Sequence, residues 1–423
     1  MKEEFLHYIW KYKLYQNSEL KSTGNENIEI LNQGTHNYDS GPDFFNAKIK
    51  IENTVWAGNV EVHINSSDWY AHNHHTNKAY DNVILQAVYN HDKEILRTNG
   101  QSVPTIELKF DQNLLKNYDS LISRETWVSC QEDISFVDSF TIQNWIEKLT
   151  IERLEEKSVR IKQLLQQTNN SWEEAFYIQI ARNFGFKLNS DPFEQLAKSL
   201  PLIYLAKHKE NLFQIEVLLY GQAGFLEDES GEEYFEILKK EYEFLKNKFK
   251  LKPIQKHLWK FLRSRPGNFP TIRLAQFAKL IYKSSALFSK ILEAESVNDF
   301  YELLQVEPSE YWETHYQFNK ESVKKSKTLG KSAIDIILIN TVIPFLFVYG
   351  KSKGLPELQD RAIEFLENMK AEKNSIISKW NELGIKATSA FETQALIQLK
   401  NKYCNHKKCL NCHIGNNLIR SKK

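Results

Sequence analysis

The chain has 423 residues, of which 41% are hydrophobic and 13% aromatic, enough for a substantial core and two or three domains. Its formal net charge is +1, so a nucleic acid or an anionic membrane would have to meet a local patch. The N-terminus carries Glu3 and Glu4 where a signal peptide is basic. The apolar stretch 334–350 is short and contains polar residues and Pro344, which favours a buried helix over a membrane span. We expect a soluble, cytoplasmic protein with no membrane partner.

The first part of the chain alternates strand-like runs with turn signals. The runs are rich in Val, Ile and aromatic residues, as strands are, and they cover 44–51, 54–64, 82–89 and 103–110. A helical pattern precedes them in residues 3–15, and a short helix is expected between the second run and the third. The sequence predicts a small mixed sheet flanked by helices.

The second part of the chain is dominated by helical patterns, and strand signals nearly vanish after about residue 135. The longest patterns cover 141–167, 171–185, 232–249 and 391–404. We therefore expect an α+β protein in three parts. Residues 1–134 form the mixed α/β domain, 135–400 a larger all-α domain, and 401–423 a cysteine-rich tail.

The segment DSGPDFFNAKIKIENTVWAGNVEVHI, residues 39–64, places three chemically useful side chains on two adjacent strands. Side chains alternate along a strand, so Glu61 and His63 share one face while their neighbours point into the core. Asp43 begins the preceding strand after a Gly-Pro turn that can direct its carboxylate across the hairpin. Two such carboxylates suit Mg²⁺ or Mn²⁺, and a nearby imidazole can orient the water that such an ion activates.

This arrangement resembles the PD-(D/E)XK nuclease superfamily, whose core carries Asp on one strand and Glu-x-Lys on the next. The corresponding residues are Pro42-Asp43 and Glu61-Val62-His63, within a restriction-endonuclease-like fold. The resemblance implies that Asp43 and Glu61 bind a metal and that the first helix offers a further carboxylate. The sequence departs from the family where His63 replaces the usual Lys.

A second resemblance extends over nearly the whole chain. The motifs are GPDF, WAGNVEVH, SSDW, NFGFKLN, YGQAG and RPGNFPTIR, at 41–44, 56–63, 66–69, 183–189, 220–224 and 265–273. Together they are similar to those of an uncharacterised bacterial family, a domain of unknown function. That resemblance implies no activity.

Two other interpretations of these residues remain open. Asp43 can be a turn residue, with Glu61 and His63 on the wet face of an ordinary hairpin. A zinc site can also be built from histidines, because imidazole suits Zn²⁺. Its ligands would come from His63, Asp68, His72, His74 and His75.

The tail contains three of the four cysteines, Cys404, Cys409 and Cys412, within nine residues. This spacing is typical of a metal site rather than of a disulfide framework. The fourth ligand is Cys130, or else His406 or His413. The sequence predicts a structural site for Zn²⁺ or a [4Fe–4S] cluster and does not separate the two.

A basic segment at 260–279 contains Arg263, Arg265 and Arg273 around a turn with Phe269. Arginine with an interleaved aromatic ring can contact nucleic acid, although a solvated junction between helices has the same composition. Our leading hypothesis is a metal-dependent nuclease acting on DNA or RNA phosphodiesters, with Asp43, Glu61 and His63 at its centre. The alternative is a non-catalytic nucleic-acid-binding or scaffold protein that keeps a structural metal. The sequence does not determine the oligomeric state.

Overall fold

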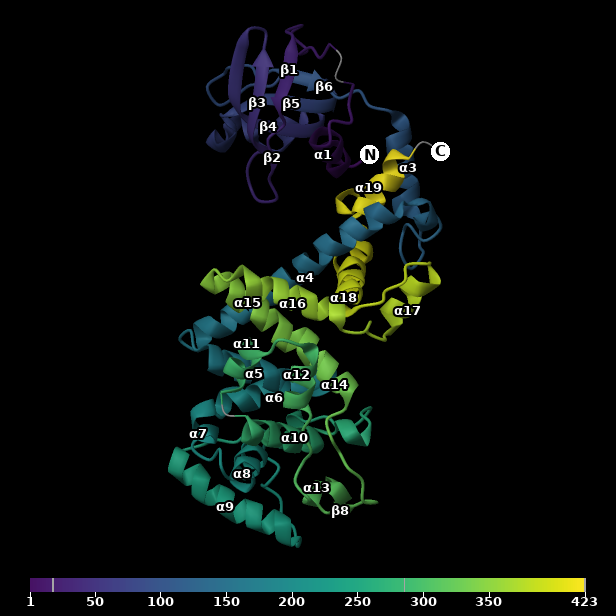
Figure 1. Cartoon of the computed structure of the whole chain (residues 1–423). Helices are drawn as coiled ribbons and strands as arrows, with labels where there is room; N and C mark the ends of the chain where they lie inside the picture. The colour runs from purple at the N-terminus through teal and green to yellow at the C-terminus, as the bar shows by residue number, and fades with distance from the viewer. Residues whose placement is uncertain (17–18, 285, 422–423) are drawn as a thin grey trace. The chain divides into compact units, whose positions relative to one another are not determined.

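The structure, a computed structural model, describes residues 1–16, 19–284 and 286–421 (Figure 1). The described residues form two compact units. The first combines Met1–Trp145 with the segment Leu399–Lys423, and the second spans Ile146–Gln398. In sequence, therefore, the second unit is inserted into the first. The fold class is α+β, as predicted: the first unit contains a mixed sheet, and the second is mainly helical.

Within the described residues, six strands form the sheet of the first unit, in the order β1-β3-β4-β5-β6 with β2 also paired to β3. The strands are β1 (Ile28–Asn32), β2 (Thr35–His36), β3 (Phe44–Ile51), β4 (Thr54–Asn65), β5 (Val83–Asn90) and β6 (Thr105–Glu107). β1, β2 and β4 run antiparallel to β3, whereas β4, β5 and β6 are parallel. The predicted mixed sheet is confirmed.

The edges of the sheet differ from the sequence prediction. β1 and β2 lie outside the predicted strands, because they are short runs among Asn and Gly residues. The predicted strand 103–110 pairs with β5 only over Thr105–Glu107. The paired part starts after Pro104, because proline has no backbone N–H to donate to a neighbouring strand.

The β3–β4 hairpin contains an irregularity close to Asp43. Its register pairs Phe44 with Val60 and is shifted between Phe44 and Ala47, where Asn46 has a φ of +58°. Such bulges bend a strand and re-aim its side chains. The register places Asp43, the residue before β3, beside Glu61 on β4.

Helix α1 (Glu3–Lys11) packs against β4 and β5. Phe5, Leu6 and Ile9 are fully buried, which fixes the helix on the sheet. Glu3 and His7 are four residues apart and therefore lie on one side of the helix. The apolar contact thus determines where these two polar side chains are placed.

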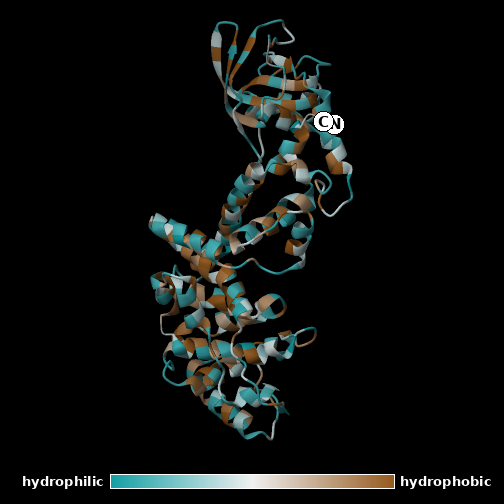
Figure 2. Cartoon of the chain, turned by 45° about the vertical axis from the view of Figure 1, so that its right-hand side comes forward, coloured by the Kyte–Doolittle hydropathy of each residue, from teal (hydrophilic) through white to brown (hydrophobic). Residues whose placement is uncertain are grey.

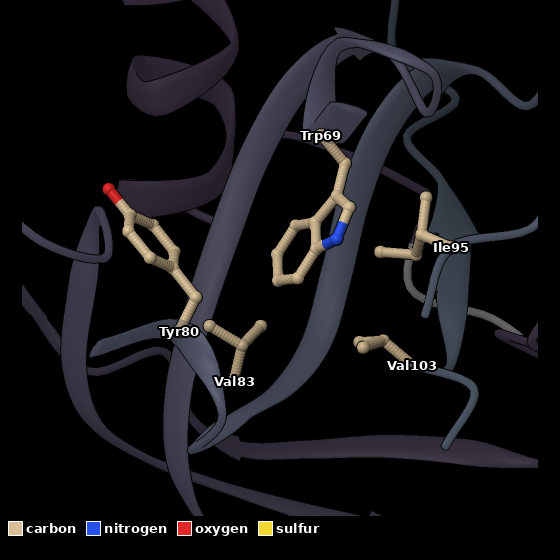
Figure 3. Close-up of a cluster of buried hydrophobic side chains, with 5 residues drawn as sticks. All are labelled: Trp69, Tyr80, Val83, Ile95 and Val103. Carbon is tan, nitrogen blue, oxygen red and sulfur yellow. The ribbon is translucent and has the colours of Figure 1, made fainter. Parts of the chain in front are cut away.

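The connection from β4 to β5 contains α2 (Asp68–Ala71), η1 (His74–Thr76) and η2 (Lys78–Tyr80). It is anchored by a buried cluster in which Trp69 lies between Tyr80 on one side and Ile95 with Val103 on the other (Figure 3). The Trp69 indole N–H donates to the carbonyl of Leu96 at 3.0 Å. Because this cluster is large and apolar, it holds the histidines of the connection in fixed positions.

The rest of the first unit comes from both ends of the chain. It comprises α3 (Gln112–Ser123), η3 (Ile134–Phe136), the start of α4 (Ser139–Gln167), the π-helix η7 (Leu399–Tyr403), η8 (Cys404–His406), η9 (Cys409–Asn411) and α19 (His413–Arg420). α19 packs against α3, where the Asn117 amide donates to the carbonyls of Ile419 and Ser421 at 3.0 and 3.2 Å. The residues after 399 are thereby attached to the first unit.

The second unit is built from helices of mostly ordinary length. They are the rest of α4, α5 (Trp172–Phe184), α6 (Phe186–Ser199), α7 (Leu202–Ala206), α8 (Leu212–Gln222), α9 (Glu233–Phe249), α10 (Pro270–Lys283), α11 (Leu287–Glu293), α12 (Val297–Leu304), α13 (Tyr311–Thr314), α14 (Lys331–Ile337), α15 (Ile343–Lys353), α16 (Pro356–Asn368), α17 (Ser375–Glu382) and α18 (Ala390–Gln398). A two-stranded hairpin, β7 (His315–Gln317) with β8 (Lys320–Glu321), completes it. Figure 2 shows hydrophobic and hydrophilic residues interleaved along these helices.

One described helical run, Lys331–Lys353, is long and apolar enough to cross a membrane by length and composition alone. It consists of α14, the π-helix η6 (Leu338–Val342) and α15. In the structure, 72% of its most apolar window is buried inside the protein.

Candidate functional site

Asp43 and Glu61 are locked together by two reciprocal hydrogen bonds. The backbone N–H of Asp43 donates to Glu61 Oε2 at 3.1 Å, and the backbone N–H of Val62 donates to Asp43 Oδ2 at 2.9 Å. The first bond joins the start of β3 to a side chain of β4, and the second joins β4 to a side chain at the start of β3. The structure thus brings together the two carboxylates that the sequence predicted to be neighbours.

His7 adds an imidazole that the sequence analysis missed. Its Nε2 lies 3.4 Å from Asp43 Oδ2 and 3.8 Å from Glu3 Oε1. Ligand atoms of Glu3, His7 and Asp43 all lie within 4.8 Å of one another. His7 Nε2 is buried and has no well-directed hydrogen bond among the described residues. A buried nitrogen facing two carboxylates without a bonded proton partner fits the donor set of a divalent cation.

A second group of histidines lies on the other side of Glu61. Glu61 Oε1 is 3.1 Å from His74 Nε2 and 3.5 Å from His63 Nε2. His72 Nδ1 is 3.2 Å from His63 Nε2, and ligand atoms of the three histidines lie within 4.8 Å of one another. His74 is stacked on the ring of Tyr80, with centroids 3.8 Å apart. Glu61 therefore stands between two sets of potential ligands.

Two members of the predicted histidine site lie elsewhere. Asp68 accepts the backbone N–H of Asn65 at 2.9 Å, and the His75 ring contacts Tyr70 with centroids 5.0 Å apart. The potential zinc ligands are therefore limited to His63, His72 and His74.

Gln86 on β5 determines which nitrogen of His63 carries the proton. The Gln86 side-chain amide donates to His63 Nδ1 at 3.0 Å and to the carbonyl of Ser66 at 3.3 Å. Its oxygen accepts from the Thr105 hydroxyl at 3.3 Å. Since His63 Nδ1 accepts, the proton of the neutral ring is on Nε2, which faces Glu61 and His72. His63 is thus a hydrogen-bond donor toward the centre of the site.

The site is buried rather than exposed on a wet strand face. Glu61 is 4% exposed and His63 0% exposed. The expectation that their face of the hairpin is solvated is wrong, because α1 and the α2–η1 connection cover it. Burial of polar groups on this scale requires partners, and the contacts above supply them.

Burial and charge separate the pKa values of the two carboxylates. Burial, followed by the charge of Asp43, raises the pKa of Glu61 to about 9. Burial also acts on Asp43, but His7 and the Val62 amide outweigh it and lower the pKa of Asp43. Burial opposes protonation of His7, yet Asp43 and Glu3 raise its pKa to about 10. Protons on Glu61 and His7 therefore compensate the clustered carboxylates, and a bound cation can take their place.

The two histidines on the far side of Glu61 stay neutral. Burial lowers the pKa of His63 to about 4 and also lowers the pKa of His74. A neutral imidazole beside Glu61 does not repel a cation.

The four cysteines come together in the first unit. Cys130 lies between α3 and η3, Cys404 begins η8, Cys409 begins η9, and Cys412 precedes α19. They are free thiols, and Cys130 and Cys412 are buried. Burial raises the pKa of Cys130 to about 12, and the neighbouring Cys412 and Cys409 add to the shift. The predicted fourth ligand of the tail cysteines thus lies beside them.

Tight local packing fixes the backbone around Cys409 and Cys412. Burial raises the pKa of Cys412 to about 11, partly offset by backbone hydrogen bonds from Gly415 and Ile414. A Cβ on Gly415 would lie 2.2 Å from the carbonyl oxygen of Cys409, so only glycine allows this close approach. The His413 ring is stacked on Trp145, with centroids 4.2 Å apart, and His406 is exposed.

Four thiolates can hold either a tetrahedral Zn²⁺ ion or a [4Fe–4S] cluster, so both predicted groups fit this ligand set.

The three predicted nucleic-acid contacts belong to the second unit, and one of them is structural. Arg273 is 6% exposed, its guanidinium donates to Gln276 at 2.8 Å, and it lies over the ring of Phe186. It is buried because α10 begins at Pro270 and turns this position into the core. Arg273 is therefore not available to a phosphate. Arg263 and Arg265 are exposed.

A family model described as "Protein of unknown function (DUF2851)" matches residues 3–375, and the chain belongs to this family. The full-length resemblance to an uncharacterised family is thereby confirmed. The match includes the candidate metal ligands and Cys130 and ends before Cys404. Neither the curated proteins nor the solved structures contained a match to the chain.

Proposed function

We propose that this member of the DUF2851 family is a metal-dependent nuclease that hydrolyses the phosphodiester bonds of DNA or RNA. The observation that carries the proposal is the pair of Asp43 and the buried Glu61, held by reciprocal hydrogen bonds, with His7 Nε2 3.4 Å from Asp43 Oδ2. Two carboxylates fixed side by side in a protein interior are costly unless something compensates their charge. A divalent cation does so and also provides the chemistry of phosphoryl transfer.

The order of elements supports the same proposal. An N-terminal helix packs on an antiparallel hairpin, and a helical connection then leads to a parallel strand. The resemblance to PD-(D/E)XK nucleases implies this arrangement, with Asp at the start of one strand and Glu inside the next. Here those positions are occupied by Asp43 and Glu61.

The ligands favour Mn²⁺ over Mg²⁺. Glu3, Asp43 and Glu61 offer carboxylate oxygens, which both ions accept, and His7 offers an imidazole nitrogen, which suits a transition metal better. When bound, the ion would polarise a phosphoryl oxygen and lower the pKa of a bound water. The residues of the chain would then have separate roles: the carboxylates and His7 would hold the ion, and His63, whose Nε2–H faces Glu61, would position that carboxylate.

The cysteines form a structural site in this proposal. Cys130 is a neighbour of the three tail cysteines, and together they make the four-thiolate set that a [4Fe–4S] cluster takes. Such a site would tie the C-terminal segment to the sheet unit and make the fold of that unit depend on the metal.

The test uses Asp43→Asn and Glu61→Gln in the full chain. Each variant removes a charge but keeps an oxygen that can accept the same backbone N–H, so the hairpin should remain folded. Purified protein is incubated with supercoiled plasmid, circular single-stranded DNA and RNA, with Mn²⁺, Mg²⁺ or EDTA. We expect cleavage by the parent with Mn²⁺, and at least a hundredfold loss in both variants.

The matched control is Glu29→Gln, which neutralises an exposed carboxylate of the same sheet. It should cleave like the parent, and thermal melting should show all three variants folded. Absence of metal-dependent cleavage by the parent, or equal cleavage by Asp43→Asn and Glu61→Gln, would overturn the proposal. Binding of nucleic acid without cleavage would point to the non-catalytic alternative.

A further inference from the structure

A groove in the first unit begins at the candidate metal ligands. It has a volume of about 480 Å³ and is lined by His7 and by parts of four distant segments. These are α1 with the following Tyr12, the end of β2 with the loop to β3, α3 at Tyr118, and residues 406–411. His7, which contacts Asp43, therefore lies both in the wall of the groove and in the candidate site.

The groove carries an excess of positive charge. Lys11, Lys407 and Lys408 line it, against the two acidic residues Glu4 and Asp39. Lys407 donates to the carbonyls of Ile122 and Arg124, whereas Lys408 is exposed. A polyanion is the complementary ligand.

Aromatic rings lie among these lysines. Tyr38 is 72% exposed and Tyr12 37% exposed, unusually high values for large rings. The Tyr38 ring contacts His36, which is stacked on Phe44, the residue after Asp43. A line of rings therefore leads from the outer wall of the groove to the metal ligands.

A second hollow continues the same surface past Tyr12. It is lined by Arg420 and by Phe140, which is 78% exposed. The Arg420 guanidinium lies 4.6 Å from the centroid of the Tyr12 ring. Exposed rings and cations thus alternate along both hollows, which share Tyr12.

We infer that this groove binds a single-stranded polynucleotide and presents it to the candidate metal site. Exposed rings stack on unpaired bases, and neighbouring cations bind the phosphates between them. A duplex keeps its bases stacked inside and offers no base face to Tyr38 or Tyr12. The inference rests on the proposed nuclease function and names its substrate class.

The C-terminal cysteines give the groove one of its walls. His406, Lys407 and Lys408 lie between Cys404 and Cys409, so a metal held by these thiols would fix the loop that carries them. The cysteine site would therefore support the groove by holding one of its walls in place.

Binding is tested with the full chain in EDTA, so that the outcome does not depend on cleavage. Fluorescence anisotropy measures the affinity for a labelled 20-nucleotide oligothymidine and for a labelled hairpin duplex. We expect the single strand to bind at least tenfold more tightly. Tyr38→Ala should weaken its binding about tenfold, whereas Tyr38→Phe, which keeps the ring, should bind like the parent. Lys408→Glu should weaken binding and reduce the slope of log affinity against log salt concentration by about 0.7.

Lys48→Glu and Tyr89→Ala serve as controls, because both residues are exposed on the same sheet away from the groove. Both should bind like the parent. Equal binding by the parent and by both Tyr38→Ala and Lys408→Glu would overturn the inference, as would duplex binding as tight as single-strand binding. Single-strand binding that depends on the groove but leads to no cleavage would keep this inference and refute the nuclease proposal.

Discussion

Gln86 offers a direct test of how the site controls His63. Gln86 is 0% exposed, and its amide donates to His63 Nδ1 at 3.0 Å. Replacing it with methionine keeps the length and volume of the side chain but removes the donor. Replacing it with glutamate instead places an acceptor beside the same nitrogen. The two variants should therefore affect His63 in different ways.

The cost of Gln86→Met follows from which partners are left without a hydrogen bond. The Ser66 carbonyl still accepts from Trp69, and the Thr105 hydroxyl still donates to the Val103 carbonyl. His63 Nδ1 alone loses its partner. One buried unsatisfied group costs about 1–3 kcal/mol. For a unit of this size that lowers the melting temperature by roughly 2–12 °C.

Nitrogen NMR of ¹⁵N-histidine-labelled protein reads the proton position directly. The parent should show His63 protonated on Nε2, and Gln86→Glu should move the proton to Nδ1, because the new carboxylate accepts from it. If the donor role of His63 matters, Gln86→Glu should also lose most of the Mn²⁺-dependent cleavage. An unchanged His63 spectrum in Gln86→Glu, or a Gln86→Met protein that melts like the parent, would refute this reasoning.

The remaining predictions concern the metals, a tight glycine and a buried acid. Cys409→Ser should lower the iron content, the brown absorbance and the melting temperature of the anaerobically purified protein. A colourless parent protein with one equivalent of zinc would contradict the proposed cluster. Gly415→Ala should have the same effects, because its Cβ would clash with Cys409. His7→Ala should reduce the preference for Mn²⁺ over Mg²⁺ in cleavage or in calorimetric binding. Burial raises the pKa of Glu216 from 4.5 to about 7, so the stability linked to its proton is complete below pH 4.5 and is lost as the pH rises through 7. Glu216→Gln should therefore gain about 2 kcal/mol over the parent between pH 5.5 and 8.5 in urea unfolding, and a pH-independent difference would contradict the shift.

The strand pattern was sufficient to predict the Asp43–Glu61 pair. Alternation fixes the face of Glu61, and the Gly-Pro turn fixes the start of the next strand, so both follow from local sequence. The cysteines Cys404, Cys409 and Cys412 could be grouped for the same reason, since they lie within nine residues.

His7 and Gln86 could not be predicted, because tertiary packing places them. His7 reaches Asp43 only because the apolar side of α1 lies on the sheet, and no local pattern gives that direction. Gln86 reaches His63 because β5 runs parallel to β4, with Gln86 opposite Glu61. The one available signal was the pair Glu3 and His7, four residues apart on a helix.

For Arg273 the sequence suggested an exposed side chain, whereas the structure buries it. The segment around it is rich in arginine and proline, but the position of the helix start decides which side chain turns inward. That start depends on Pro270, whose fixed φ suits the first turn. Residue type alone therefore does not predict that Arg273 is buried in the core.

The division of the first unit between two distant segments has a consequence for its synthesis. Residues up to Trp145 leave the ribosome first, and Leu399 follows only after the whole of Ile146–Gln398 has been made. At about 5–20 residues per second, this interval lasts roughly 10–50 s. During this interval, the nascent chain contains the residues of the candidate metal site and Cys130 but neither the other three cysteines nor Lys407 and Lys408 of the groove. Translation order would therefore delay the proposed polynucleotide binding until the C-terminal segment has emerged from the ribosome.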